Sequence, residues 1–399
     1  MSTPTSTPVR RLSAVLREGE RVTALELFFD LVFVLALTQC TALMYGTNTG
    51  EGIVRALLIL GVLWWSWVGY AWLTSVVDPE EGTVRLVMFA AMAALLVAAL
   101  CVPGAFGGDA LLFACAYGVV RAAHIALFTL ASRDDHDLRR SVISLAGSTA
   151  VGVGLLITAA FTRGGVQLAL WALALALDMA GPYLFGAEGW KLMPAHFAER
   201  HGGIIIIALG ESIVAIGAGA GGHVDAGVVG AAVLGMIVAS ALWWLYFDVV
   251  AIAARRRLSR ASPGRERNEI ARDSYSYLHF PMVAGIALVA LGLKRTLLHV
   301  SDPLGTVAAA ATLGGAATYL LAHVAFRWRN MHTMSRQRVA CAAVLLALLP
   351  IEIAVSPSAI VTLGVLASVL CALIVYEAVR FAEARERVRH QVAREGVAS

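Results

Sequence analysis

Two acidic residues, Glu26 and Asp30, lie in the first long apolar stretch of the chain, within Glu-Leu-Phe-Phe-Asp-Leu-Val-Phe. A spacing of four residues places both carboxylates on one face of a helix. An Asp at the centre of a membrane helix costs roughly 2.5 to 3.5 kcal/mol on the insertion scale, so such residues are usually paired or functional. The pair therefore predicts ion pairing, cation binding or proton transfer inside a membrane.

The composition is that of a polytopic membrane protein. Hydrophobic residues make up 59% of the 399 residues and charged residues 15%, with a mean hydropathy of +0.76, whereas soluble domains are about 45 to 50% apolar. The net charge is +4, and the loop at 255–272 carries the heaviest positive charge, which is typical of a segment facing lipid headgroups. We expect the lipid bilayer as a partner and no nucleic acid.

Apolar runs of about 20 residues predict an all-α transmembrane bundle, because each run is long enough to cross a hydrocarbon core of roughly 30 Å. About 12 spans are expected. We place them at 25–46, 52–77, 84–102, 109–131, 140–161, 166–186, 202–220, 226–252, 275–295, 304–326, 337–355 and 357–379.

The basic residues predict the orientation of these spans. Most of the 31 Lys and Arg residues fall on the side that also holds both termini, and positive charge marks the cytoplasmic side. Residues 1–22 are then a basic cytoplasmic segment rather than a cleavable signal, and residues 381–399 are a cytoplasmic tail. We expect a multi-pass protein of the bacterial inner membrane. The sequence is compatible with a homo-oligomer.

The two halves of the chain predict an internal repeat of six spans each, at 23–190 and 191–380. An even number of spans gives both copies the same orientation, related by an axis along the membrane normal. The matched positions are Glu26 with Glu199, Trp64-Trp65 with Trp243-Trp244, and Asp178 with Glu377.

Nearly all the ionisable residues of the spans fall in the cytoplasmic half, which predicts a polar cavity open to the cytoplasm. The alternative is a buried ion-pair network in which Arg121 and Arg85 neutralise two of the acids. The candidate binding or proton-coupling residues are Glu26, Asp30, Arg121, His124, Asp178, Glu199, Glu211, Asp248, His279 and His323.

The five cysteines are scattered, without a C-x-x-C pair, and no H-E-x-x-H motif accompanies the histidines. We therefore predict no metal site, and the sequence leaves the cofactor open.

Three motifs carry a resemblance to a known family. They are Glu-Leu-Phe-Phe-Asp-Leu-Val-Phe-Val from Glu26, His196-Phe-Ala-Glu-Arg running into Leu-Gly-Glu211-Ser, and Tyr277-Leu-His-Phe-Pro. The chain resembles the bacterial low temperature requirement A (LtrA) family over roughly residues 17–380. The resemblance implies an integral membrane protein and marks the acids as motif residues, but it names no substrate.

Two function classes follow, both with a small-molecule or lipidic substrate. The first is a proton- or cation-coupled transporter built from two parallel halves. The second is an intramembrane enzyme acting on a lipidic or terpenoid substrate, with Asp30, Asp248 or Glu26 as general acid and Trp243, Trp244 and Phe29 stabilising positive charge. A structural role in cold membranes is a third alternative.

Overall fold

A computed structural model describes residues 21–184, 189–220 and 224–383. These residues contain 12 helices long and apolar enough to cross a membrane, which confirms the predicted all-α bundle. The spanning helices are α1 Ala24–Thr47, α2 Gly50–Thr74, α3 Gly82–Leu100, α4 Ala110–Ala131, α5 His136–Ala159, α6 Gly164–Leu184, α7 Pro194–Gly219, α8 Ala226–Phe247, α11 His279–Leu298, α12 Thr306–Met331, α13 Arg336–Val355 and α14 Ala359–Arg380.

The described residues also contain four short helices, and three of them explain where the predicted boundaries differ. The span expected at 226–252 ends earlier, and the amphipathic helix α9 (Val250–Arg260) follows it. The span expected at 275–295 is preceded by α10 (Arg265–Ile270) and by η2 (Ala271–Tyr277), a π-helix. The remaining short element is η1 (Val102–Gly104).

Helix α7 begins eight residues before the expected position 202, at Pro194. Proline is well suited to the first turn because its missing N–H has no partner there in any case. The extra turns contain His196 and Arg200, and because both residues have low hydropathy, a search for apolar runs does not include them. Both side chains are nevertheless buried.

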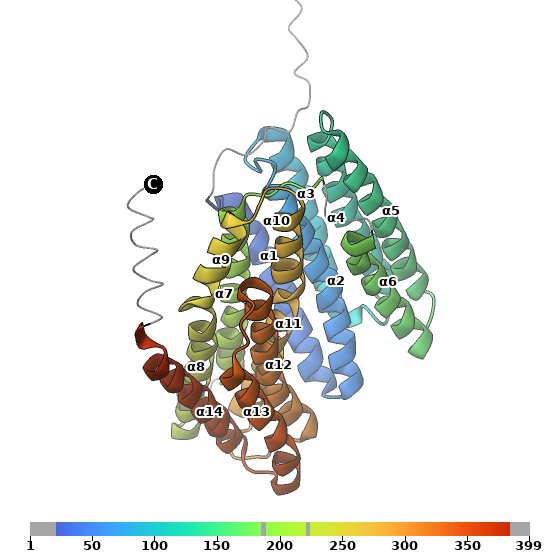
Figure 1. Ribbon diagram of the computed structural model, residues 1–399. Coiled ribbons are helices and arrows are strands. Elements are labelled where there is room, and N and C mark those ends of the chain that lie inside the picture. Colours follow the sequence, from blue (N-terminus) through green and yellow to red (C-terminus); the bar gives the residue numbers. More distant parts are fainter. Residues whose placement is uncertain (1–20, 185–188, 221–223, 384–399) are drawn as a thin grey trace, which may run out of the picture.

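Helices α1 and α2 run through the middle of the bundle, with α4, α5 and α6 on one side and α7 to α14 on the other (Figure 1). Helix α1 contacts α2 and α3 of the first half and α7 and α11 of the second half. The first helix therefore joins the two groups of helices, and any charge on it lies near their boundary.

Contacts follow the same order in both halves. In the first half, α1 contacts α2 and α3, and α3 to α6 contact one another in succession. In the second half, α7 contacts α8 and α11, and α11 to α14 contact one another in succession. This order agrees with the six-span repeat, which stays a prediction.

The closest helix packing involves α11 and α12. A Cβ atom on Gly285 would lie 2.6 Å from the carbonyl oxygen of Gly315 and 2.9 Å from the amide nitrogen of Tyr319. Small residues at such positions let two backbones approach closely, as is common between membrane helices.

The outside of the bundle is apolar. Large hydrophobic side chains such as Leu31, Leu184 and Val379 are 61%, 69% and 77% exposed. Apolar surface of this extent needs a non-aqueous environment, and together with 12 spanning helices it identifies a multi-pass membrane protein.

Candidate functional site

Glu26 and Asp30 are buried between α1 and α7. Glu26 is the third residue of α1 and takes part in a capping box, because its carboxylate accepts a hydrogen bond from the backbone N–H of Thr23 (2.8 Å). Its Oε1 atom also lies 2.8 Å from His196 Nε2 and 3.0 Å from Arg200 Nη1. Glu26 thus fixes the start of α1 and joins it to α7.

Arg200 also binds the second acid. Its Nη2 atom lies 2.6 Å from Asp30 Oδ1, and its Nη1 atom donates to the hydroxyl of Thr74 on α2 (3.1 Å). Asp30 Oδ1 accepts a further bond from Trp67 Nε1 (2.8 Å), and the guanidinium lies 5.5 Å from the centre of the Trp67 ring. One buried guanidinium therefore connects three helices.

The local sequence explains this geometry. Glu26 and Asp30 are four residues apart on α1, and His196 and Arg200 are four residues apart on α7. Each pair lies on one helix face, so two acidic positions can meet two basic positions when the helices pack. We call Glu26, Asp30, His196 and Arg200 the α1–α7 charge cluster; each is at most 1% exposed.

A cavity of about 420 Å³ adjoins this cluster, and Asp30 and Arg200 line it. Asp30 Oδ2 accepts no hydrogen bond from the described residues, so this oxygen is available to a proton or ligand. The other lining residues come from the segment before α1, from α1 itself and from α7, α8, α9 and η2: Val22, Leu27, Ala198, Glu199, Gly202, Gly203, Ile206, Tyr246, Phe247, Ala251, Ile252, Arg255 and Tyr275.

Further along the same two helices lies Glu211, which is 2% exposed. The hydroxyl of Thr38 on α1 donates a hydrogen bond to the Glu211 carboxylate. The α1–α7 interface therefore carries a second polar contact, about three helical turns from Arg200 on α7.

Two other predicted residues, Arg121 and Asp178, meet within the first half. Arg121 on α4 pairs with Asp178 on α6 at 3.0 Å, and Asp178 also accepts from the Tyr117 hydroxyl at 3.0 Å. Arg121 donates to Thr149 on α5 at 2.6 Å. This ion pair joins α4, α5 and α6, as the buried-network alternative expects for Arg121, whereas Arg85 donates to the backbone carbonyl of Glu80.

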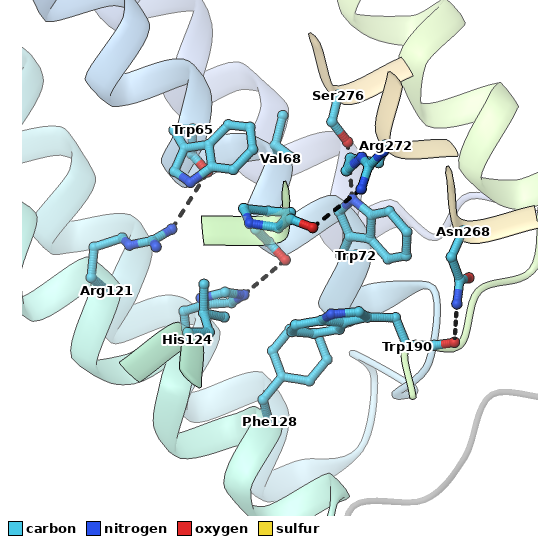
Figure 2. Close-up of a pocket in the computed structure, with 13 residues that line it drawn as sticks. Trp65, Val68, Trp72, Arg121, His124, Phe128, Trp190, Asn268, Arg272 and Ser276 are labelled. Carbon is cyan, nitrogen blue, oxygen red and sulfur yellow. Dashed lines mark hydrogen bonds between the residues drawn. The ribbon is translucent and has the colours of Figure 1, made fainter. Parts of the chain in front are cut away.

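A smaller cavity of about 60 Å³ lies beside Arg121, and Figure 2 shows its lining. His124 Nε2 bonds the carbonyl of Gly69 (2.9 Å), and Asn268 donates to the carbonyl of Trp190 (2.7 Å). The walls are largely aromatic, from Trp65, Trp72, Phe128 and Trp190. This cavity is much smaller than the one beside the α1–α7 charge cluster.

The predicted histidines of the second half belong to an aromatic cluster. His279 Nε2 lies 2.8 Å from the Tyr246 hydroxyl, and the His279 ring stacks on Tyr275 with centroids 5.2 Å apart. His323 Nδ1 lies 2.8 Å from Arg338 Nη1. His279 is therefore close to the larger cavity, because Tyr246 and Tyr275 also line it.

The two remaining candidates lie nearer the surface. Glu199 is exposed and lines the larger cavity, whereas Glu26, its expected counterpart in the first half, is buried. Asp248 is half-buried and does not line that cavity. Trp243 and Trp244 are 45% and 37% exposed.

Sequence reasoning missed several partners of the predicted residues. From the sequence, His196 and Arg200 are given only as part of a family motif and not as candidate site residues; the signal that could have identified them is the same four-residue spacing on α1 and α7. The partners that carry no such signal are Trp67, Thr38, Thr149 and Arg338. The described residues contain no group of three or more His, Cys, Asp or Glu side chains placed to hold a metal ion.

Comparison with known proteins identifies the family. The family model described as bacterial low temperature requirement A protein (LtrA) matches residues 21–375. An uncharacterized protein of Rhizobium meliloti (strain 1021), RA0937, is 31% identical over 308 residues, which is 74% of this chain and 74% of the relative. No solved structure gives a significant match. The chain therefore belongs to the bacterial low temperature requirement A (LtrA) family.

Proposed function

We propose that this protein is a secondary transporter of the bacterial cytoplasmic membrane that couples the movement of a small molecule to a proton or another cation. Both termini face the cytoplasm in this proposal, as the distribution of basic residues predicts. The observation that carries it is the position of the Asp30–Arg200 ion pair, which joins the two halves and also forms part of the wall of a large cavity.

A proton can act on this pair directly. Protonation of Asp30 at Oδ2 removes the negative charge that holds Arg200 and so weakens the contact between α1 and α7. A ligand that prefers one arrangement of the halves then shifts the equilibrium between the two arrangements. This is the energetic requirement of coupled transport.

Glu211 lies along the same helix interface, deeper in α7, where Thr38 is its hydrogen-bond donor. Carriers built from repeated halves place substrate and ion sites at the repeat interface near the bilayer midplane. In this proposal, Asp30 receives the proton from the cavity and Glu211 marks the continuation of the path between the halves.

The test is proton movement in vesicles that contain the purified protein and a trapped pH-sensitive dye. A panel of amino acids, amines, organic acids and short-chain lipids is added outside, and wild type is compared with Asp30→Asn. We expect at least one compound to drive proton movement in wild type and not in the variant. Asp134→Asn is the control, because Asp134 is an exposed carboxylate between α4 and α5. Equal signals from wild type and Asp30→Asn would overturn the proposal.

An enzyme acting on a lipidic substrate is the second candidate, because one side of the cavity is apolar and exposed. Leu27 and Ile206 both line it, and each is 54% exposed, so an apolar chain of a bound substrate can lie against them. Asp30 is then the general acid. Incubation with bacterial lipid extract and mass spectrometry of the products tests this candidate: a new product with wild type, absent with Asp30→Asn, supports it, and an unchanged extract removes it.

A further inference from the structure

Two opposite charges line the large cavity without binding each other. Glu199 lies on α7 and Arg255 lies on α9, and both side chains are exposed. Neither forms an ion pair or hydrogen bond with any residue that the structure describes. An acid and a guanidinium held apart in one cavity can bind the two ends of a zwitterion, whereas a purely anionic or cationic ligand uses only one of them.

The basic side of the cavity has a second hydrogen-bond donor. Tyr275 is 1% exposed and lines the cavity, and its hydroxyl has no partner among the described residues. Arg255 is near enough to interact electrostatically with Tyr275. A buried hydroxyl without a partner is costly. In the proposed complex, a turn of the Tyr275 side chain toward the cavity lets a phosphate or carboxylate oxygen accept from both donors.

The acidic side has two acceptors for an ammonium group. Glu199 provides its carboxylate, and Asp30 provides Oδ2, which the described residues leave without a hydrogen bond. An ammonium has three donors and no acceptor, so it suits this side of the cavity. The anionic and cationic ends of a ligand are therefore recognised by different helices.

The cavity also has an apolar side. Leu27 on α1 and Ile206 on α7 line it and are more than half exposed. A chain attached to the headgroup can pass between these residues into the bilayer. The volume of about 420 Å³ falls within the range of ligand-binding pockets, roughly 300 to 1,000 Å³, which is room for a small headgroup.

We infer that the large cavity binds a membrane amphiphile with a zwitterionic headgroup, in which a primary amine and a phosphate or carboxylate are joined by a short linker. This inference rests on the proposed function, because it concerns the same cavity. The anionic group lies at Arg255 and Tyr275, the ammonium lies at Glu199 and Asp30, and the chains leave between Leu27 and Ile206. The same site serves a carrier or an enzyme acting on such an amphiphile.

Native mass spectrometry of the full-length protein in lipid-free detergent tests this inference. The probes are dioctanoyl phosphatidylethanolamine, dioctanoyl phosphatidylglycerol and the chain-free headgroup glycerophosphoethanolamine. We expect the ethanolamine lipid to bind at least tenfold more tightly than either of the other probes.

Three substitutions locate the binding site. Glu199→Gln should weaken binding of the ethanolamine lipid about tenfold and leave the glycerol lipid unchanged, because only the first carries an amine. Arg255→Gln and Tyr275→Phe should weaken both lipids. The matched controls are Glu80→Gln and Arg140→Gln, since both side chains are exposed and lie away from the cavity; neither should change binding.

Three results would overturn the inference: equal affinity for the two lipids, no effect of Glu199→Gln, or binding of the chain-free headgroup as tight as that of the lipid. The last result would assign the site to a free zwitterionic metabolite. The assay uses no proton gradient, so it can succeed where the vesicle experiment fails. Failure of lipid selectivity likewise leaves proton-coupled transport of another compound testable.

Discussion

Arg200 Nη2 lies 2.6 Å from Asp30 Oδ1, and this contact joins residues 170 positions apart in the chain. Both side chains are almost completely buried, at 1% exposed each, and the open side of the pair is the cavity that they line. A buried pair gains its stability from both partners, and loss of one partner leaves the other charge uncompensated. The first prediction follows from that asymmetry.

Arg200→Gln should lower the free energy of unfolding by about 3 to 5 kcal/mol, because Glu26 and Asp30 lose their shared guanidinium. Arg200→Lys should recover only part of the loss, since an ammonium does not reproduce the planar fork that reaches both acids. Thermal unfolding in detergent measures both variants. Arg140→Gln, on the exposed surface of α5, is the control; equal stability of Arg200→Gln and this control would remove the charge cluster as a stabilising contact.

Thr38→Val should destabilise the protein by about 1 to 3 kcal/mol and reduce any proton movement in vesicles. Its hydroxyl donates to Glu211, which is 2% exposed, and a buried carboxylate that loses a donor has a large desolvation cost. Thr129→Val is the control, because Thr129 is exposed and bonds only a carbonyl of its own helix. If the two variants behave alike, the Thr38–Glu211 contact has no special role.

Gly285→Ala should destabilise the bundle by about 1 to 3 kcal/mol, since the new methyl group would overlap the backbone of α12 at Gly315 and Tyr319. Gly314→Ala should have the opposite sign. Nothing lies within 4 Å of a Cβ atom there, so alanine's better helix propensity raises stability by up to about 1 kcal/mol. Denaturation of the two variants under one set of conditions checks this, and a stabilised Gly285→Ala would show that the helices can separate without loss.

Asp135 provides a prediction on pH, outside the spanning helices. It caps α5 by accepting from the N–H of Leu138 (3.0 Å), and the hydrogen bond from Lys191, together with this cap, holds the pKa of Asp135 below its usual value near 3.8. A lowered pKa in the folded state means that the stabilisation is complete above the unfolded pKa and is lost as the pH falls through the folded pKa.

Asp135→Ala should therefore cost about 1 kcal/mol at pH 7, and the difference from wild type should shrink below about pH 4. Asp135→Asn is the comparison, because its amide oxygen keeps the cap but does not titrate, so its own stability should show less dependence on pH in that range. Unfolding curves at pH 7 and pH 3 measure this, and a difference that grows on acidification would contradict the assignment.

The sequence predicts the spans well because one physical requirement, about 20 apolar residues, defines each of them. The exceptions have physical causes. The first turns of α7 contain His196 and Arg200, which are polar in sequence but are neutralised by contacts with α1. The π-helix Ala271–Tyr277 lies between α10 and α11. The pattern of apolar residues does not show where the backbone hydrogen bonds change from the α-helical to the π-helical spacing.

The partners of the predicted site residues could be inferred only in part. Arg121 was expected to neutralise an acid, and it pairs with Asp178. Arg200 is the ion-pair partner of Glu26 and Asp30 because α1 packs against α7. No local sequence pattern specifies that these two helices are neighbours. Positions matched between the two halves by sequence also need not have the same environment, since Glu26 is buried and Glu199 is exposed.

The charge cluster makes the two halves unequal partners. Helix α1 contributes only acids to it, and α7 contributes His196 and Arg200. Two copies of the N-terminal half would bring carboxylate against carboxylate at this surface, and two copies of the C-terminal half would bring base against base. When the two halves are expressed as separate chains, each should therefore assemble with the other half and not with a second copy of itself. The charge cluster thus specifies which halves pair, although both belong to one polypeptide.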